Sequence, residues 1–230
     1  MMPGLRRHER RTALEPFGSS VVREQLLRSS AVLTSRVATA AVLALPGIVL
    51  AALGVAHPAE LTQHSADSWY ALHLILLPLF PLLGLALLPL VRPLNRPVGL
   101  VVTLLVYVYA VYYSALDLLA GVATGAVMRR EAGRPGAVDA LFNTGNQLAT
   151  YGVWAFLLAC LVVAGDLVWR HRLRAAAPAV LLVAASVSLL DSHIYRWRGV
   201  ATVLVIGLAT GWLALLDRER AASGAPRPPG

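Results

Sequence analysis

The chain has 230 residues, of which 57% are hydrophobic and 14% are charged. Soluble domains carry about 25% charged residues, so this composition excludes an ordinary soluble domain and indicates a membrane protein. The formal net charge is +8 and all 20 basic residues are arginines, which we attribute to membrane orientation and not to a nucleic-acid partner.

Six apolar runs dominate the chain, and a bilayer crossing needs roughly 20 helical residues. The runs predict an all-α polytopic membrane protein, a bundle of six transmembrane helices over residues 37–216. The predicted spans are about 37–57, 69–91, 98–120, 146–168, 175–191 and 199–216. An Arg-rich cytoplasmic segment, 1–36, precedes this domain, and a disordered cytoplasmic tail, 217–230, follows it.

The first apolar run is long enough to span, so we expect an uncleaved signal anchor and no cleaved signal peptide. Before it, Ser20 to Arg36 forms either a helix lying on the inner leaflet or an extension of the first span. The sequence leaves both alternatives open.

Arginine distribution predicts a cytoplasmic location for both termini. With that orientation, fifteen of the 20 arginines face the cytoplasm and five lie in outer loops. We therefore expect a multi-pass protein of the bacterial cell (plasma) membrane. Trp69 and Trp197 are predicted to lie at the outer interface.

Short connections determine which helices pack side by side. Residues 92–97 and 170–174 are short enough to make the flanking helices antiparallel, and 125–145 is predicted to be the longest connection. Two GxxxG motifs, at 121–125 and 207–211, predict close helix packing within the molecule. Cys160 is the only cysteine, which excludes an internal disulfide and a cysteine metal cluster.

One group of polar residues is predicted to lie at a common depth near the outer ends of the spans. Ionisable residues in spans are costly and usually face the protein interior. Asp117 is the strongest candidate, since Tyr113 lies one helical turn before it and His73 lies about one turn into the second span. The predicted pocket comprises His57, His64, His73, Tyr113, Asp117, Asn146 and His193.

Three interpretations of this cluster stay open. In the first, a His–Asp hydrogen bond simply links two helices. In the second, the group binds a metal or handles protons, and in the third it holds a small ligand or lipid headgroup. For zinc, His73, Asp117 and His193 would supply three ligands from three helices and leave a fourth position for water.

Residues 77–84, Tyr113–Gly121 and Asp191–Gly199 resemble segments of uncharacterised small membrane proteins of GC-rich bacteria. A more distant similarity is to the membrane hydrolases that include alkaline ceramidases and adiponectin-receptor-like proteins. That resemblance implies a zinc site on Ser68, His73, Asp117 and His193. The chain departs from that family in having six predicted spans, not seven, and one late histidine, not a pair.

The sequence thus predicts an integral membrane protein with an outward-facing His/Asp pocket that binds or moves a small solute or lipid. The alternatives are a metal-dependent hydrolase acting at the outer leaflet and a structural or regulatory partner of another membrane protein. Its expected surroundings are the lipid bilayer, with a small ligand or a membrane-protein partner.

Overall fold

The computed structural model describes residues 17–91, 96–131, 134, 136–192 and 196–223, and these residues form helices joined by short connections without any strand. Residues up to Ser35 group as one unit and residues from Arg36 onward as a second. The described residues of the first unit, 17–35, are helical. Residues 1–16 and 92–95 lie outside the described residues, as do residues 224–230 of the predicted disordered tail 217–230. Disorder is wrong for residues 217–223, because the helix Arg196–Ser223 includes them.

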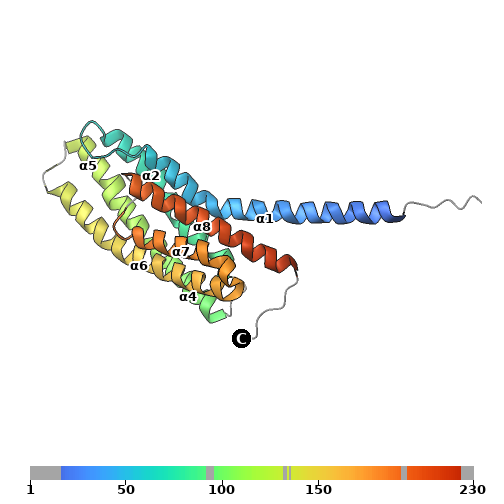
Figure 1. The fold of residues 1–230 in the computed structure, drawn as a ribbon. Helices are drawn as coiled ribbons and strands as arrows, with labels where there is room; N and C mark the ends of the chain where they lie inside the picture. Colours follow the sequence, from blue (N-terminus) through green and yellow to red (C-terminus); the bar gives the residue numbers. More distant parts are fainter. Residues whose placement is uncertain (1–16, 92–95, 132–133, 135, 193–195, 224–230) are drawn as a thin grey trace, which may run out of the picture. The chain divides into compact units, whose positions relative to one another are not determined.

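Figure 1 shows the elements in chain order. They are α1 (Phe17–Val55), α2 (Ala66–Leu85), α3 (Leu88–Val91), α4 (Arg96–Leu116), the π-helix η1 (Asp117–Ala123), α5 (Thr124–Glu131), α6 (Ala137–His171), α7 (Leu173–Ser188) and α8 (Arg196–Ser223).

Five stretches of helix are long and apolar enough to cross a membrane. They are Ser30–Val55, Ala66–Val91, Pro97–Arg130, Ala137–His171 and Trp197–Asp217. The fifth predicted span corresponds to α7, which has 16 residues and is shorter than the others. The described residues are therefore all-helical, with five helices long and apolar enough to cross a membrane and one shorter apolar helix, which indicates a multi-pass membrane protein.

The predicted long connection at 125–145 is wrong, because most of it is helical. Helix α5 continues the third span to Glu131, and α6 begins already at Ala137. The sequence between them contains Gly133, Pro135 and Gly136, which are the first strong helix breakers after Gly125. Polarity of 126–131 suggested a loop, but polar residues alone do not end a helix.

The predicted tight connection at 170–174 is confirmed. Arg172 adopts a left-handed φ of 55° and separates α6 from α7, which pack against each other. Beside this turn, Arg170 donates hydrogen bonds to the carboxylates of Asp166 and Asp217 and to the carbonyl of Leu90. One guanidinium therefore ties α6 to α8 and to α3.

Both GxxxG motifs pack within the molecule, as predicted. A Cβ at Gly207 would lie 2.6 Å from the Ala44 carbonyl oxygen, and one at Gly47 would lie 2.7 Å from the Cα of Gly207. The backbones of α1 and α8 therefore touch at this crossing. In the other motif, Gly125 lies against the backbone of Tyr70 in α2.

We expect Gly47→Ala to destabilise the protein by about 1–3 kcal/mol, because the three nearest atoms that the new methyl group meets, in Val203 and Gly207, all belong to the backbone. Thermal unfolding in detergent measures the effect.

Gly165→Ala is the matched control, since a Cβ there meets nothing within 4 Å. An alanine in an open helical position stabilises by about 0.5–1 kcal/mol. Equal melting temperatures for the two variants would contradict the α1–α8 contact.

Candidate functional site

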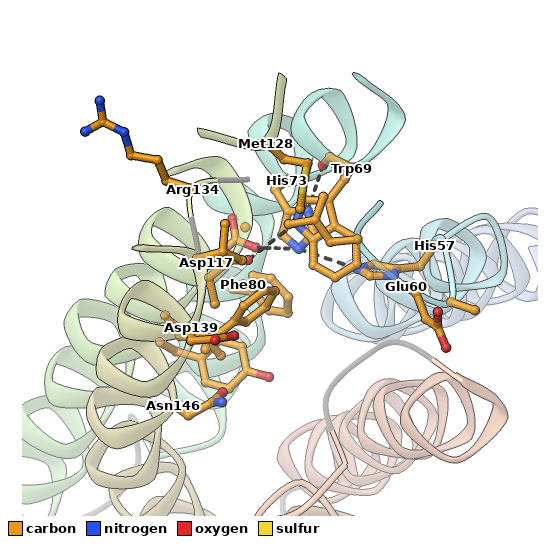
Figure 2. Close-up of a pocket in the computed structure, with 18 of the residues that line it drawn as sticks. His57, Glu60, Trp69, His73, Phe80, Asp117, Met128, Arg134, Asp139 and Asn146 are labelled. Atoms are coloured by element: carbon orange, nitrogen blue, oxygen red, sulfur yellow. Dashed lines mark hydrogen bonds and ion pairs between the residues drawn. The ribbon is translucent and has the colours of Figure 1, made fainter. Parts of the chain in front are cut away.

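A cavity of about 530 Å³ opens where the connection after α1, helix α2, the α4–η1 junction and the start of α6 meet. Figure 2 shows His57, His73 and Trp69 on one side of it, with Asp139 and Asn146 on α6 across from them. Apolar side chains, among them Phe80, Leu116, Met128 and Phe142, complete the wall. The site thus combines an apolar wall with polar groups from several elements.

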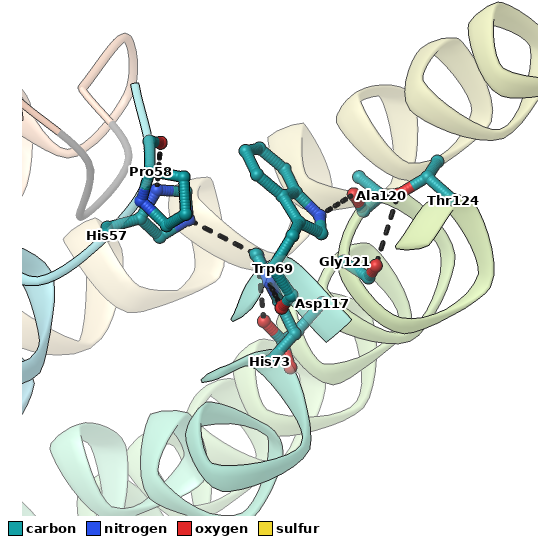
Figure 3. A network of polar contacts seen from close by, with 8 residues as sticks. All are labelled: His57, Pro58, Trp69, His73, Asp117, Ala120, Gly121 and Thr124. Carbon is teal, nitrogen blue, oxygen red and sulfur yellow. Dashed lines mark hydrogen bonds and ion pairs between the residues drawn. The ribbon is translucent and has the colours of Figure 1, made fainter. Parts of the chain in front are cut away.

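The π-helix η1 shapes one wall of this cavity. A π-helical turn is wider than an α-helical one and is frequently found at functional sites. Here the carbonyl of Ala120 accepts hydrogen bonds from the Trp69 indole nitrogen (3.3 Å) and from the Thr124 hydroxyl (2.6 Å) (Figure 3). Side chains therefore satisfy this backbone carbonyl of the widened turn, and the hydrogen bond from Trp69 links α2 to η1.

Gly121 in η1 leaves the space that the His73 side chain occupies. A Cβ at residue 121 would overlap the imidazole of His73. The absence of a side chain at this position is therefore a condition for the observed placement of His73.

Two imidazoles face each other in the cavity. His73 Nδ1 lies 2.7 Å from the carbonyl oxygen of Trp69, and His57 Nδ1 lies 2.7 Å from that of Pro58. Because a carbonyl only accepts, both Nδ1 atoms donate. The two Nε2 atoms lie 3.4 Å apart (Figure 3).

Trp69 holds both rings. Its indole stacks on the His73 ring with the centroids 4.9 Å apart and meets the His57 ring edge-on with the centroids 4.7 Å apart. Both distances lie in the range of about 4.5–7 Å that is typical of aromatic pairs. Trp69 is buried within the protein, and its predicted position at the outer membrane interface stays a prediction. Trp197, by contrast, is exposed.

Asp117 lies next to this pair at the first position of η1. Its Oδ1 is 3.9 Å from His73 Nε2, which is within range for charge attraction but too long for a hydrogen bond. Its Oδ2 is buried and has no hydrogen-bond partner among the described residues. The expected direct His73–Asp117 hydrogen bond is therefore not formed, although the two residues are brought together.

Of the predicted pocket residues, His57, His73, Tyr113, Asp117 and Asn146 line the cavity. His64 is exposed in the connection after α1 and does not line it.

His193 lies outside the described residues, so the predicted metal set of His73, Asp117 and His193 stays a prediction. Within the described ranges, no three His, Cys, Asp or Glu side chains enclose a metal position as they stand.

Sequence reasoning missed most of the other lining residues, among them Glu60, Trp69, Asp139 and Phe142. Glu60 and Asp139 were not predicted as pocket residues because they fall in segments that the sequence analysis took for loops. For the π-helix, the only available signal was the run of small residues around Gly121.

No protein-family model, curated protein or solved structure matches this chain. Its function therefore has to be inferred from its own residues.

Burial lowers the pKa of His57, and the hydrogen bond to Pro58 offsets this only in part. The folded state thus binds fewer protons at this group than the unfolded state, whose histidine pKa is about 6.5. We expect the stability contributed by neutral His57 to be present above that pH and to be lost as pH falls through and below it.

The measurement is the melting temperature at several pH values with a chelator present, for wild type and His57→Gln. The variant should lose less stability on acidification. His64→Gln, an exposed histidine of the same connection, is the control and should follow wild type. An identical fall for His57→Gln and wild type would contradict the prediction.

Proposed function

We propose that this protein binds a small amphipathic solute or lipid in the cavity around His57, His73 and Asp117. The observation that supports this most is the cavity itself, in which polar side chains converge opposite an apolar wall. A ligand with a polar end and a short hydrocarbon part would match both surfaces.

The charges favour a cationic or hydrogen-bond-donating polar end. Glu60, Asp117 and Asp139 contribute three carboxylates to the lining, whereas Arg134 is the one arginine that the described lining contains. Figure 2 shows the Arg134 guanidinium pointing away from His73 and Asp117. A carboxylate or phosphate would face net negative charge at this end of the cavity.

The proposed setting is the plasma membrane, with α7 as a sixth, short span and both termini in the cytoplasm. At about 1.5 Å per residue, α7 is about 24 Å long, somewhat shorter than an average hydrocarbon core of about 30 Å. Local thinning of the bilayer accommodates such a mismatch at modest cost. The arginine distribution supports this orientation.

Cysteine accessibility tests this topology on a Cys160→Ala background, because Cys160 is the only cysteine. His64 and Leu173 are exposed side chains near opposite ends of the spans. We expect a membrane-impermeant maleimide to label His64→Cys in intact cells and Leu173→Cys only after lysis. The reverse pattern would place the cavity on the cytoplasmic side.

Ligand binding is tested with two alkyl chains of equal length, a primary amine and a carboxylate, added to the purified protein in nanodiscs. We expect the amine to raise the melting temperature of wild type and the carboxylate to leave it unchanged. Asp117→Asn, which keeps the shape but removes the charge, should lose most of the response to the amine.

His64→Ala is the control, since this residue does not line the cavity. If Asp117→Asn keeps the full response, the cavity is not the binding site. If both Asp117→Asn and His73→Ala only lower the melting temperature and no ligand acts on wild type, the role as a structural partner of another membrane protein is favoured.

A further inference from the structure

We propose that a second cavity, between α2 and α5, binds a phosphate group, either that of a phospholipid headgroup or free phosphate. This cavity measures about 350 Å³ and is lined by Gln63, Asp67, Tyr70, Ala126, Arg129 and Arg130. None of these residues lines the first cavity, around His73, so the inference does not rest on the amphipathic ligand proposed above.

Close packing of α5 on α2 creates the second cavity. A Cβ at Gly125 would lie 3.0–3.2 Å from the Cβ, Cα and N atoms of Tyr70, so the two helices approach closely at this point. Arg129 follows Gly125 by one helical turn and therefore lies on the same face of α5. Its guanidinium carbon is 4.8 Å from the centroid of the Tyr70 ring, which is a cation–π contact. The ring thus positions the guanidinium at the cavity.

Asp67 holds the same guanidinium from a second direction. Asp67 and Tyr70 are three residues apart in α2 and so lie on one face of that helix. The Asp67 carboxylate forms an ion pair with Arg129, which has no other hydrogen-bond or ion-pair partner among the described residues. One carboxylate does not satisfy all five N–H donors of a guanidinium. Donors of a positioned arginine therefore remain for an anion, and phosphate oxygens can accept from two of them at once.

Arg130 adds a second positive charge. Its side chain is exposed, and it has no ion-pair partner within the part of the chain that the structure describes. Two guanidiniums and the carboxylate of Asp67 give the lining a formal charge of +1. The first cavity is different, because three carboxylates and one arginine line it. The second cavity therefore favours an anion where the first favours a cation.

The place of the second cavity along the helices favours phosphate among anions. Tyr70 lies near the start of the apolar stretch Ala66–Val91, and the two arginines end the stretch Pro97–Arg130. The first of these stretches has 26 residues and is about 39 Å long, close to the thickness of about 40–45 Å that a bilayer has with its headgroups. Its first residues thus lie at the level of the headgroups, where phospholipids carry their phosphates.

The first experiment titrates the full chain, purified in dodecyl maltoside, with dioleoyl phosphatidylglycerol in mixed micelles. We expect this lipid to raise the melting temperature, because a ligand that binds only the folded state stabilises it. Dioleoylglycerol has the same acyl chains and no phosphate, so it is the matched control and should leave the melting temperature unchanged.

A second titration, with sodium phosphate against sodium chloride of equal ionic strength, distinguishes the two sources of the phosphate group. A shift with sodium phosphate alone would identify free phosphate as the ligand. A shift with phosphatidylglycerol alone would identify the phospholipid headgroup, and a shift with both would show that the phosphate group suffices.

Arg129→Gln and Arg130→Gln test the two cations. Each should weaken binding of the active phosphate compound about 10-fold or more, because each removes charge-assisted hydrogen bonds to the phosphate oxygens. Arg198 is also an exposed arginine paired with an aspartate, Asp191, but it does not line this cavity. Arg198→Gln is therefore the matched control and should bind like wild type.

Tyr70→Leu separates the positioning of Arg129 from its charge. The variant keeps both arginines and removes the ring that the guanidinium lies over, so affinity should fall about 2–5-fold. Melting curves without ligand establish that each variant is folded.

Folded wild type that responds to neither phosphatidylglycerol nor sodium phosphate would overturn the proposal, as would an equal response to dioleoylglycerol. Unchanged affinity in both Arg129→Gln and Arg130→Gln would also overturn it. An equal loss in these two variants and in Arg198→Gln would do the same, because the effect would then come from the total charge of the surface. None of these results bears on amine binding in the first cavity.

Discussion

The imidazole of His73 fills space that any side chain at residue 121 would take, and the geometry of the cavity follows from this contact. Because the ring sits against the backbone of η1, it lies beside Asp117 at the start of the same element. Trp69, one turn earlier in α2, bonds to η1 and covers the ring. A single absent side chain therefore permits α2 and η1 to approach and their polar groups to meet.

Polar groups within apolar helices are expensive unless partners satisfy them. At the turn between α6 and α7, Arg170 meets two carboxylates and a carbonyl, so its charge is balanced and its role is structural. Around His73 the balance is different, because one buried carboxylate oxygen of Asp117 has no hydrogen-bond partner among the described residues. This contrast supports the proposal that a ligand binds in the cavity.

The sequence by itself determined the helical class, the apolar segments of membrane-spanning length and the packing glycines, and it singled out His73 and Asp117 as candidates. Hydropathy, small residues and ionisable residues in apolar runs can each be recognised locally along the chain. Only the tertiary structure decided that α7 is short, that 125–131 is helical and that Trp69 is buried. It also decided that His57 faces His73. His57 lies in the α1–α2 connection and His73 in α2, so their contact depends on how the helices pack and on where the π-helix widens one of them. The spacing of the two residues in the sequence does not determine the distance between their rings.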